Sequence, residues 1–223
     1  MIKQLLRILF MVFISIAAHG QAMKNIFLQL PGACTPELNK EERKLLLQNA
    51  AYIIPGGDSI ETARYTIDSI SNDYLHAEYD FTTGQRGFNS YELKRFKTTK
   101  GPDMILFSTF GGTRASFFQN ELRVFYLQNK KLVEDSHQKL LPQSVPVNDF
   151  IKKQTPDSVK KIIEQAMSTA YVFDTEKKNS IVFTLYTQYQ VDKFEKWILG
   201  YTFLFTWTGE KFTRKLQLGE LDW

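Results

Sequence analysis

Residues 197–218 read WILGYTFLFTWTGEKFTRKLQL, and this C-terminal stretch decides the fold. Apolar side chains occupy every second position from Leu199 to Trp207, so in an extended chain they all leave the backbone on one side. A short loop containing Gly209 follows, and the alternation resumes at Phe212. Two alternating runs separated by a glycine-containing loop predict a β-hairpin.

The register of this hairpin can also be predicted. If Trp207 lies opposite Phe212, Phe203 lies close to Leu216, and apolar cross-strand pairs of this kind fix the register of a hairpin. The resulting aromatic face has to be covered by other parts of the chain. We expect two amphipathic helical segments upstream to cover it, with the stripe from Val159 to Met167 lying directly above.

The two helical segments have recognisable ends. Asn39 followed by Glu42 predicts a capping box, with apolar residues at helical spacing as far as Ile53 and Pro55-Gly56-Gly57 as the stop. Thr155-Pro156-Asp157-Ser158 predicts the start of the second helix, whose apolar stripe continues to Ala170.

Between the helices the apolar period changes from 3.6 to 2, which predicts a series of strands over 61–132. The expected features are a hairpin turning at Ser71-Asn72-Asp73, a charged edge strand at Tyr91–Lys97, a strand buried on both faces at Met104–Phe110, a bend at Gly111-Gly112 and a turn at Gln119-Asn120-Glu121. Strands are expected to resume at Ile181 and to lead into the closing hairpin.

The order of helix, many strands, helix and three strands predicts an α+β fold, with mainly antiparallel β-sheets packed against two amphipathic helices. We expect residues 21–223 to form a single domain with a weak internal boundary near residues 140–150. An internal duplication is an alternative, because Leu30-Pro31 and Leu141-Pro142 each precede a helix, but the two halves have unequal strand counts.

Residues 1–20 have the pattern of a signal peptide, with Lys3 and Arg7 ahead of an apolar run and small residues at a cleavage site after Gly20 or Ala22. The apolar run of 11 residues is short for a membrane anchor, which needs about 20. The sequence therefore predicts export to the periplasm or the cell surface, with no membrane span in the mature chain.

Cys34 is the only cysteine, so the chain cannot form an internal disulfide. Lipidation of Cys34 is disfavoured because it does not follow the apolar run directly, and a buried small side chain is the simpler interpretation.

The basic composition is weaker than the pI of about 9.0 indicates. Without Lys3 and Arg7 the chain has 26 Lys and Arg against 24 Asp and Glu, and the lysines occur as scattered pairs. Because positive and negative charges nearly balance, we do not expect a nucleic-acid-binding surface.

No catalytic constellation, metal site or cofactor motif is found in the sequence. It has no Gly-x-Ser-x-Gly elbow, no His-Glu-x-x-His motif, no phosphate-binding loop and no dinucleotide fingerprint. His76 falls on the polar side of a strand with Glu78 and Asp80, where we expect solvent rather than a metal. Asp135-Ser136-His137 has the letters of a catalytic triad, but triads are assembled from distant segments.

The chain is rich in aromatic residues, with 18 Phe, 10 Tyr and 3 Trp. Most phenylalanines fall on inward positions and are expected to fill the core. Tyr186, Tyr189 and Trp197 lie near polar residues at strand ends, so they are the candidates for an exposed platform that binds a glycan or a peptide.

The chain resembles a family of uncharacterised exported proteins from Bacteroidetes. The resemblance rests on short motifs spread over the mature chain: Phe27-Leu28-Gln29-Leu30-Pro31, Leu38-Asn39-Lys40-Glu41-Glu42-Arg43, Asp73-Tyr74-Leu75, Val147-Asn148-Asp149-Phe150 and Trp207-Thr208-Gly209-Glu210-Lys211-Phe212. It departs from the family pattern at Gly32, where relatives tend to have aspartate. The resemblance implies export and one α+β unit, and it implies no reaction or catalytic residue.

Two functional hypotheses follow. The first is a non-enzymatic binding module of the periplasm or cell surface, with a protein or a glycan of the envelope as partner. The second is a hydrolase acting on envelope material, in which carboxylates such as Glu78 and Asp80 are brought together only by the fold.

Overall fold

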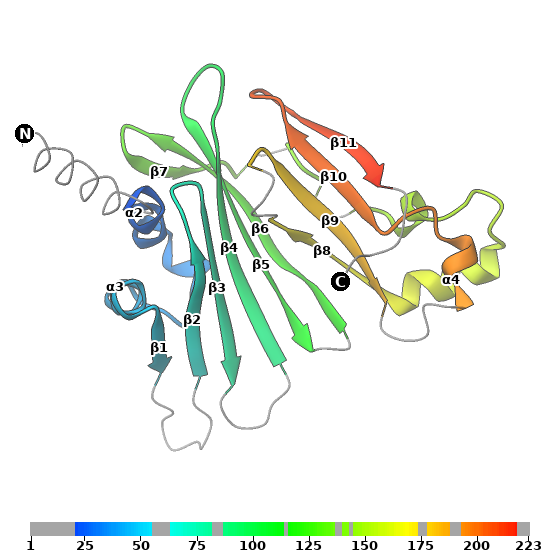
Figure 1. Cartoon of the computed structure of the whole chain (residues 1–223), viewed down its shortest axis with the longest axis horizontal. Coiled ribbons are helices and arrows are strands. Elements are labelled where there is room, and N and C mark those ends of the chain that lie inside the picture. The colour runs from blue at the N-terminus through cyan, green and yellow to red at the C-terminus, as the bar shows by residue number, and fades with distance from the viewer. Residues whose placement is uncertain are drawn as a thin grey trace, which may run out of the picture.

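The computed structural model describes residues 21–54, 63–81, 87–113, 116–136, 140–142, 145–173, 178–187 and 193–217 (Figure 1). The predicted signal peptide lies outside these residues. The helices are α2 (Gln21–Gln29), α3 (Lys40–Asn49) and α4 (Asp157–Ala166). The chain forms one antiparallel sheet between α3 and α4 and a second one after α4, so the predicted α+β class is confirmed.

Both sheets are meanders in which each strand pairs with its neighbour in sequence. The seven-stranded sheet contains β1 (Ala51–Ile54), β2 (Ala63–Ile70), β3 (Tyr74–Phe81), β4 (Gly87–Phe96), β5 (Asp103–Thr113), β6 (Ser116–Gln128) and β7 (Lys131–Glu134). The four-stranded sheet contains β8 (Met167–Val172), β9 (Ser180–Thr187), β10 (Thr202–Trp207) and β11 (Phe212–Gln217). The segment 140–150, where a weak boundary is predicted, connects the two sheets.

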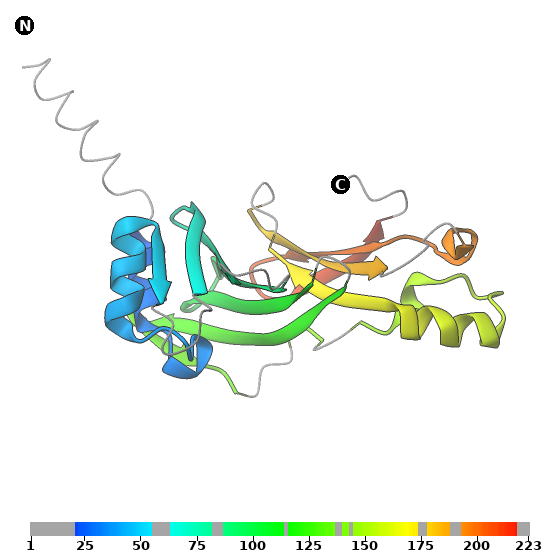
Figure 2. The same ribbon diagram turned by 90° about the horizontal axis from the view of Figure 1, so that it is seen from below.

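The molecule has three layers. Helices α2 and α3 lie on one side of the seven-stranded sheet, and the four-stranded sheet lies on the other (Figure 2). Alternation along β4 shows the division, because Leu93 belongs to the helix-side core and Phe96 to the core between the sheets. The four-stranded sheet covers the β4–β6 part of its side, where Met104, Leu106 and Val124 are fully buried.

The first predicted helix is correct at its start and wrong at its end. Asn39 and Glu42 form the predicted capping box. The helix stops at Asn49, however, because Ala50 takes a left-handed conformation with φ of 56° and strand β1 follows. Helix α2 is an additional helix, outside the two helical segments that the sequence predicts.

A buried arginine joins the two helices. Arg43 Nη1 donates to the carbonyl oxygens of Phe27 at 3.1 Å and Leu30 at 2.8 Å, at the C-terminal end of α2. The Phe27 carbonyl also accepts the Leu30 N–H at 3.3 Å, so the guanidinium adds a donor to it and caps the Leu30 carbonyl that follows the helix.

The predicted edge strand at Tyr91–Lys97 is wrong, since β4 lies between β3 and β5. Lys94 is 2 % exposed, and its Nζ donates to the carbonyl oxygen of Ser180 in the other sheet at 2.7 Å. A strand that carries this lysine can lie in the middle of the sheet because the buried ammonium group donates to a carbonyl oxygen of the other sheet.

The hairpin about Ser71-Asn72-Asp73 is confirmed, and the burial predicted for Met104–Phe110 is confirmed as far as Thr109, with Phe110 half-buried. The predicted bend and the predicted turn that follow it are wrong. Gly111 and Gly112 continue β5, with a Cβ at Gly111 meeting the Phe88 carbonyl oxygen at 2.8 Å. The predicted turn at Gln119-Asn120-Glu121 is a β-bulge within β6.

Helix α4 is shorter than predicted. It ends at Ala166, and Met167 begins β8, so the apolar residues from Met167 to Ala170 belong to a strand. The expected cap at Thr155 is also wrong, because Pro156 occupies the capping position and no side chain caps the helix.

The closing hairpin has the predicted register, with Phe203 opposite Leu216 and Trp207 opposite Phe212. Phe203, Phe205 and Trp207 point into the core, whereas Leu199 precedes the strand and is 39 % exposed. The predicted cover by helices is wrong in its main part. The ring centre of Trp207 lies 6.3 Å from that of Phe96 in the larger sheet, and Phe203 packs against Phe150 at 4.8 Å.

No helix among the described residues combines the length and apolar character needed to cross a membrane.

Candidate functional site

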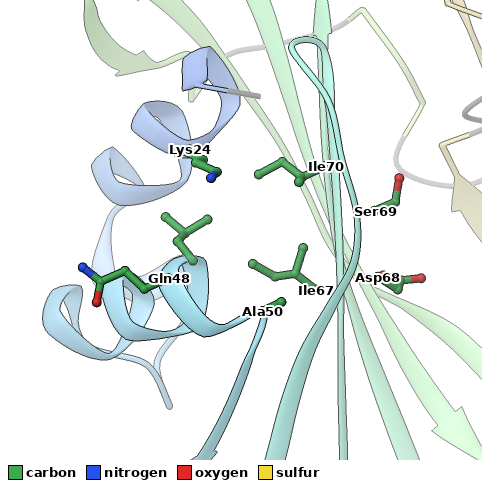
Figure 3. A pocket seen from close by; sticks show the side chains of 8 residues that line it. Lys24, Gln48, Ala50, Ile67, Asp68, Ser69 and Ile70 are labelled. Carbon is green, nitrogen blue, oxygen red and sulfur yellow. The ribbon is translucent and has the colours of Figure 1, made fainter. Parts of the chain in front are cut away.

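The candidate site begins at a β-bulge in β2. Ile67 pairs with Ala77 and Ser69 pairs with His76, so Asp68 is an extra residue in the strand. The bulge interrupts the alternation, and the side chains of Asp68 and Ser69 point to the same side of the sheet, away from those of Ile67 and Ile70 (Figure 3). Bulges of this kind redirect side chains and often occur next to functional sites.

The redirected carboxylate of Asp68 meets the imidazole of His76. Its two oxygens lie 2.7 and 2.8 Å from His76 Nδ1. The other ring nitrogen, Nε2, lies 3.3 Å from Ser90 Oγ on β4. Asp68, His76 and Ser90 thus form a connected row across three adjacent strands, which we call the relay row.

The relay row runs from solvent into the protein. The side chain of Asp68 is 52 % exposed and that of His76 is 15 % exposed, whereas Ser90 is buried. The predicted solvated histidine is therefore wrong. The bulge at Asp68 supplies His76 with a partner that strict alternation does not place beside it.

Glu92 is the fully buried carboxyl next to this row. It accepts hydrogen bonds from Tyr74 Oη at 2.9 Å and from the backbone N–H of Phe173 at 3.0 Å. Burial raises the pKa of Glu92 to about 7, and the lowering effects of His76, the Phe173 N–H, Tyr74 and Lys94 only partly offset it.

Glu92 also joins the two sheets, together with Gln119. Phe173 directly follows β8, the edge strand of the smaller sheet, and Gln119 Oε1 accepts the N–H of Tyr171 in β8 at 2.9 Å. Gln119 Nε2 donates to Ser108 Oγ at 2.9 Å. Glu92 and Gln119 thus accept hydrogen bonds from the backbone N–H groups of Phe173 and Tyr171, at the edge of the small sheet.

Part of the same side of the large sheet remains uncovered by the second sheet. On β2 and β3, Arg64, Glu78 and Asp80 are exposed, and Arg64 pairs with Asp80 in register. On the neighbouring strand Phe88 pairs with Asp80 and is half-buried. Its ring centre lies 6.2 Å from that of Phe110, edge to face. We call Arg64, Glu78, Asp80, Phe88 and Phe110 the open strand face.

Of the three residues predicted for an exposed aromatic platform, only the Trp197 side chain lies in the described part of the chain. Trp197 is half-buried against the core between the sheets, and Lys196 Nζ lies 5.2 Å from its ring centre. The side chain of Tyr186 and the whole of Tyr189 lie outside the described part of the chain.

The thiol of Cys34 belongs to the helix-side core, apart from the relay row. Cys34 is buried, and burial raises the pKa of its thiol to about 11. Arg114 and His137 fall outside the described residues. Across the described ranges, no three His, Cys, Asp or Glu residues gather in a way that could hold a metal ion.

The pocket beside the bulge is on the opposite side of β2 from the relay row. It encloses about 200 Å³ between the two N-terminal helices and β2, and Figure 3 shows its lining residues: Lys24, Leu47, Gln48, Ala50, Ile67, Asp68, Ser69 and Ile70. The side chains of Ile67 and Ile70 point into it, so its interior is mainly apolar. A second pocket of about 380 Å³ lies between α2 and the β6–β7 region.

The structure defines an α+β protein of two meander sheets and a helical layer. No protein-family model matches the chain, and no curated sequence does. It is similar to the solved structure of a domain of an uncharacterized protein from Porphyromonas gingivalis W83, with a TM-score of 0.61. The identity is 11 %, and the match covers 88 % of this chain and 98 % of that one. At this identity the likeness shows a shared fold, in a protein from the Bacteroidetes.

Proposed function

We propose that this chain is an exported binding module of the periplasm or cell surface, and that it binds a glycan of the envelope through the open strand face. The observation that carries the proposal is the half-buried aromatic pair beside exposed charged side chains. Asp80 pairs in register with Phe88, and Phe88 packs against Phe110. Sugar rings stack on aromatic faces, while carboxylates and guanidinium groups hydrogen-bond their hydroxyl groups.

The proposed export is supported by the signal-peptide pattern of residues 1–20. A glycan is favoured over a protein partner because the open strand face combines three exposed charged residues with one aromatic pair, whereas stable protein interfaces have a larger apolar centre.

The hypothesis of a glycoside hydrolase gains no support from Glu78 and Asp80. Both are exposed on the same strand, two residues apart, and neither lines either of the two pockets described above. Paired hydrolytic carboxylates instead flank the scissile bond, with a general acid in a protected environment.

Binding of the mature protein to an array of envelope glycans, followed by calorimetry on the best ligand, tests the proposal. We expect Phe88→Ala and Asp80→Asn each to weaken binding at least about tenfold, which corresponds to about 1.4 kcal/mol. Phe118→Ala is the matched control, because Phe118 is 58 % exposed on β6, opposite Gly111. Absence of any glycan ligand, or equal effects of all three substitutions, would rule out this site. Retention of an envelope protein instead would identify the alternative partner.

A further inference from the structure

The tautomer of His76 follows from its two partners. A carboxylate can only accept hydrogen bonds, so in the neutral imidazole the proton is on Nδ1 and points to Asp68. Nε2 is then an acceptor, and the Ser90 hydroxyl, 3.3 Å away, donates to it. The order carboxylate, imidazole and hydroxyl is the order in which serine nucleophiles are activated.

We propose that Ser90 is an activated nucleophile that accepts an acyl group from a small, activated carboxylic ester, with His76 as general base and Asp68 as the residue that orients it. The inference goes beyond glycan binding and stands on the relay row alone.

The chemistry uses only groups in the row and the ester. Ser90 Oγ attacks the carbonyl carbon while its proton passes to His76 Nε2, and the resulting imidazolium is stabilised by the Asp68 carboxylate. Collapse of the tetrahedral intermediate breaks the bond to the leaving alcohol, which takes the proton from His76. A water molecule then attacks the acyl carbon while His76 Nε2 takes its proton. The bond to Ser90 Oγ breaks, the carboxylic acid leaves, and Ser90 recovers its proton from His76.

Burial limits the substrate to small acyl groups. Ser90 is 2 % exposed and the side chain of His76 is 15 % exposed, so little room reaches the hydroxyl. Glu92 is two residues farther along the same strand, and its two oxygens accept hydrogen bonds from Tyr74 Oη and the Phe173 N–H.

Reaction of the full mature chain with diisopropyl fluorophosphate and with p-nitrophenyl acetate tests the proposal, with the modified peptide located by mass spectrometry. We expect one adduct, on Ser90, that is absent in Ser90→Ala. His76→Gln and Asp68→Asn should each slow its formation at least about 100-fold.

The matched control is Ser108→Ala. Ser108 lies opposite Glu92 on β5, is fully buried and bonds to Gln119, so it has no imidazole partner and its loss should not change labelling. Circular dichroism establishes that each variant is folded. An unlabelled Ser90 in the wild-type protein, or labelling at the same rate in His76→Gln, overturns the proposal and leaves the row as a structural network. Because neither reagent is a glycan, this result is independent of the binding test.

Discussion

Replacing the buried carboxyl of Glu92 with an amide, Glu92→Gln, should reduce the dependence of stability on pH. The folded-state pKa of Glu92 is raised to about 7, above its ordinary value of 4.5. The neutral carboxyl is therefore favoured by folding, and the stability it contributes is complete below pH 4.5 and is lost as the pH rises to 7. Integration between about pH 5 and pH 8 gives a loss of roughly 2 to 3 kcal/mol.

Glutamine can keep both hydrogen bonds of Glu92. Its oxygen can accept from the Phe173 N–H, and its amide nitrogen can donate to Tyr74 Oη after rotation of the phenolic hydrogen. The variant therefore removes the ionisation with little change in packing. His76 and Lys94, which interact electrostatically with Glu92, are present in both proteins.

Urea denaturation of both proteins across this pH range measures the effect. From about pH 5 to about pH 8, the free energy of unfolding of the wild type should fall by roughly 2 to 3 kcal/mol more than that of Glu92→Gln. Glu78→Gln, at an exposed position of β3, should follow the wild type. Parallel curves for Glu92→Gln and the wild type would refute the reasoning, because they would mean that burial does not control this carboxyl.

Three further substitutions or reactions test the helical layer, the closing turn and the thiol. Arg43→Met should lower the free energy of unfolding by roughly 2 to 4 kcal/mol, because the carbonyls of Phe27 and Leu30 lose the hydrogen bonds from the buried guanidinium, whereas exposed Lys44→Met should change it little. Gly209→Ala should cost about 1 to 2 kcal/mol, since φ is 101° and the new Cβ would lie 2.5 Å from Thr99 Cγ2; equal melting temperatures would contradict this. Cys34 should react with a thiol reagent at least about 100-fold more slowly in the native protein than in guanidinium, and equal rates would disprove its burial.

Local patterns predicted local structure well. The register of the closing hairpin followed from alternation alone, and the capping box at Asn39 followed from two residues three positions apart. Both depend on neighbours in sequence, which a single chain displays directly.

The positions at which a helix passes directly into a strand were harder to predict from the spacing of apolar residues. Ala50 and Met167 fall where a helix passes directly into a strand, and apolar residues there satisfy both the 3.6 and the 2 period for a few positions. The two bulges, at Asp68 and Asn120, break alternation without any glycine or proline to mark them.

The candidate site was missed for the same reason. Asp68, His76 and Ser90 are 8 and 14 residues apart, so their meeting depends on the register of three strands and on one extra residue. His76 was correctly placed on a strand, but its partners could be found only by pairing the strands first. The burial of Lys94 was equally hidden, because its acceptor lies 86 residues away.

The arrangement of the strands as two successive meanders has a consequence for folding. Each strand pairs only with strands next to it in the chain, so loop closure within each sheet costs little entropy for a protein so rich in β-structure. We expect each meander to assemble as its own cooperative unit, the N-terminal one first during synthesis, with docking of the two as the last and slowest step.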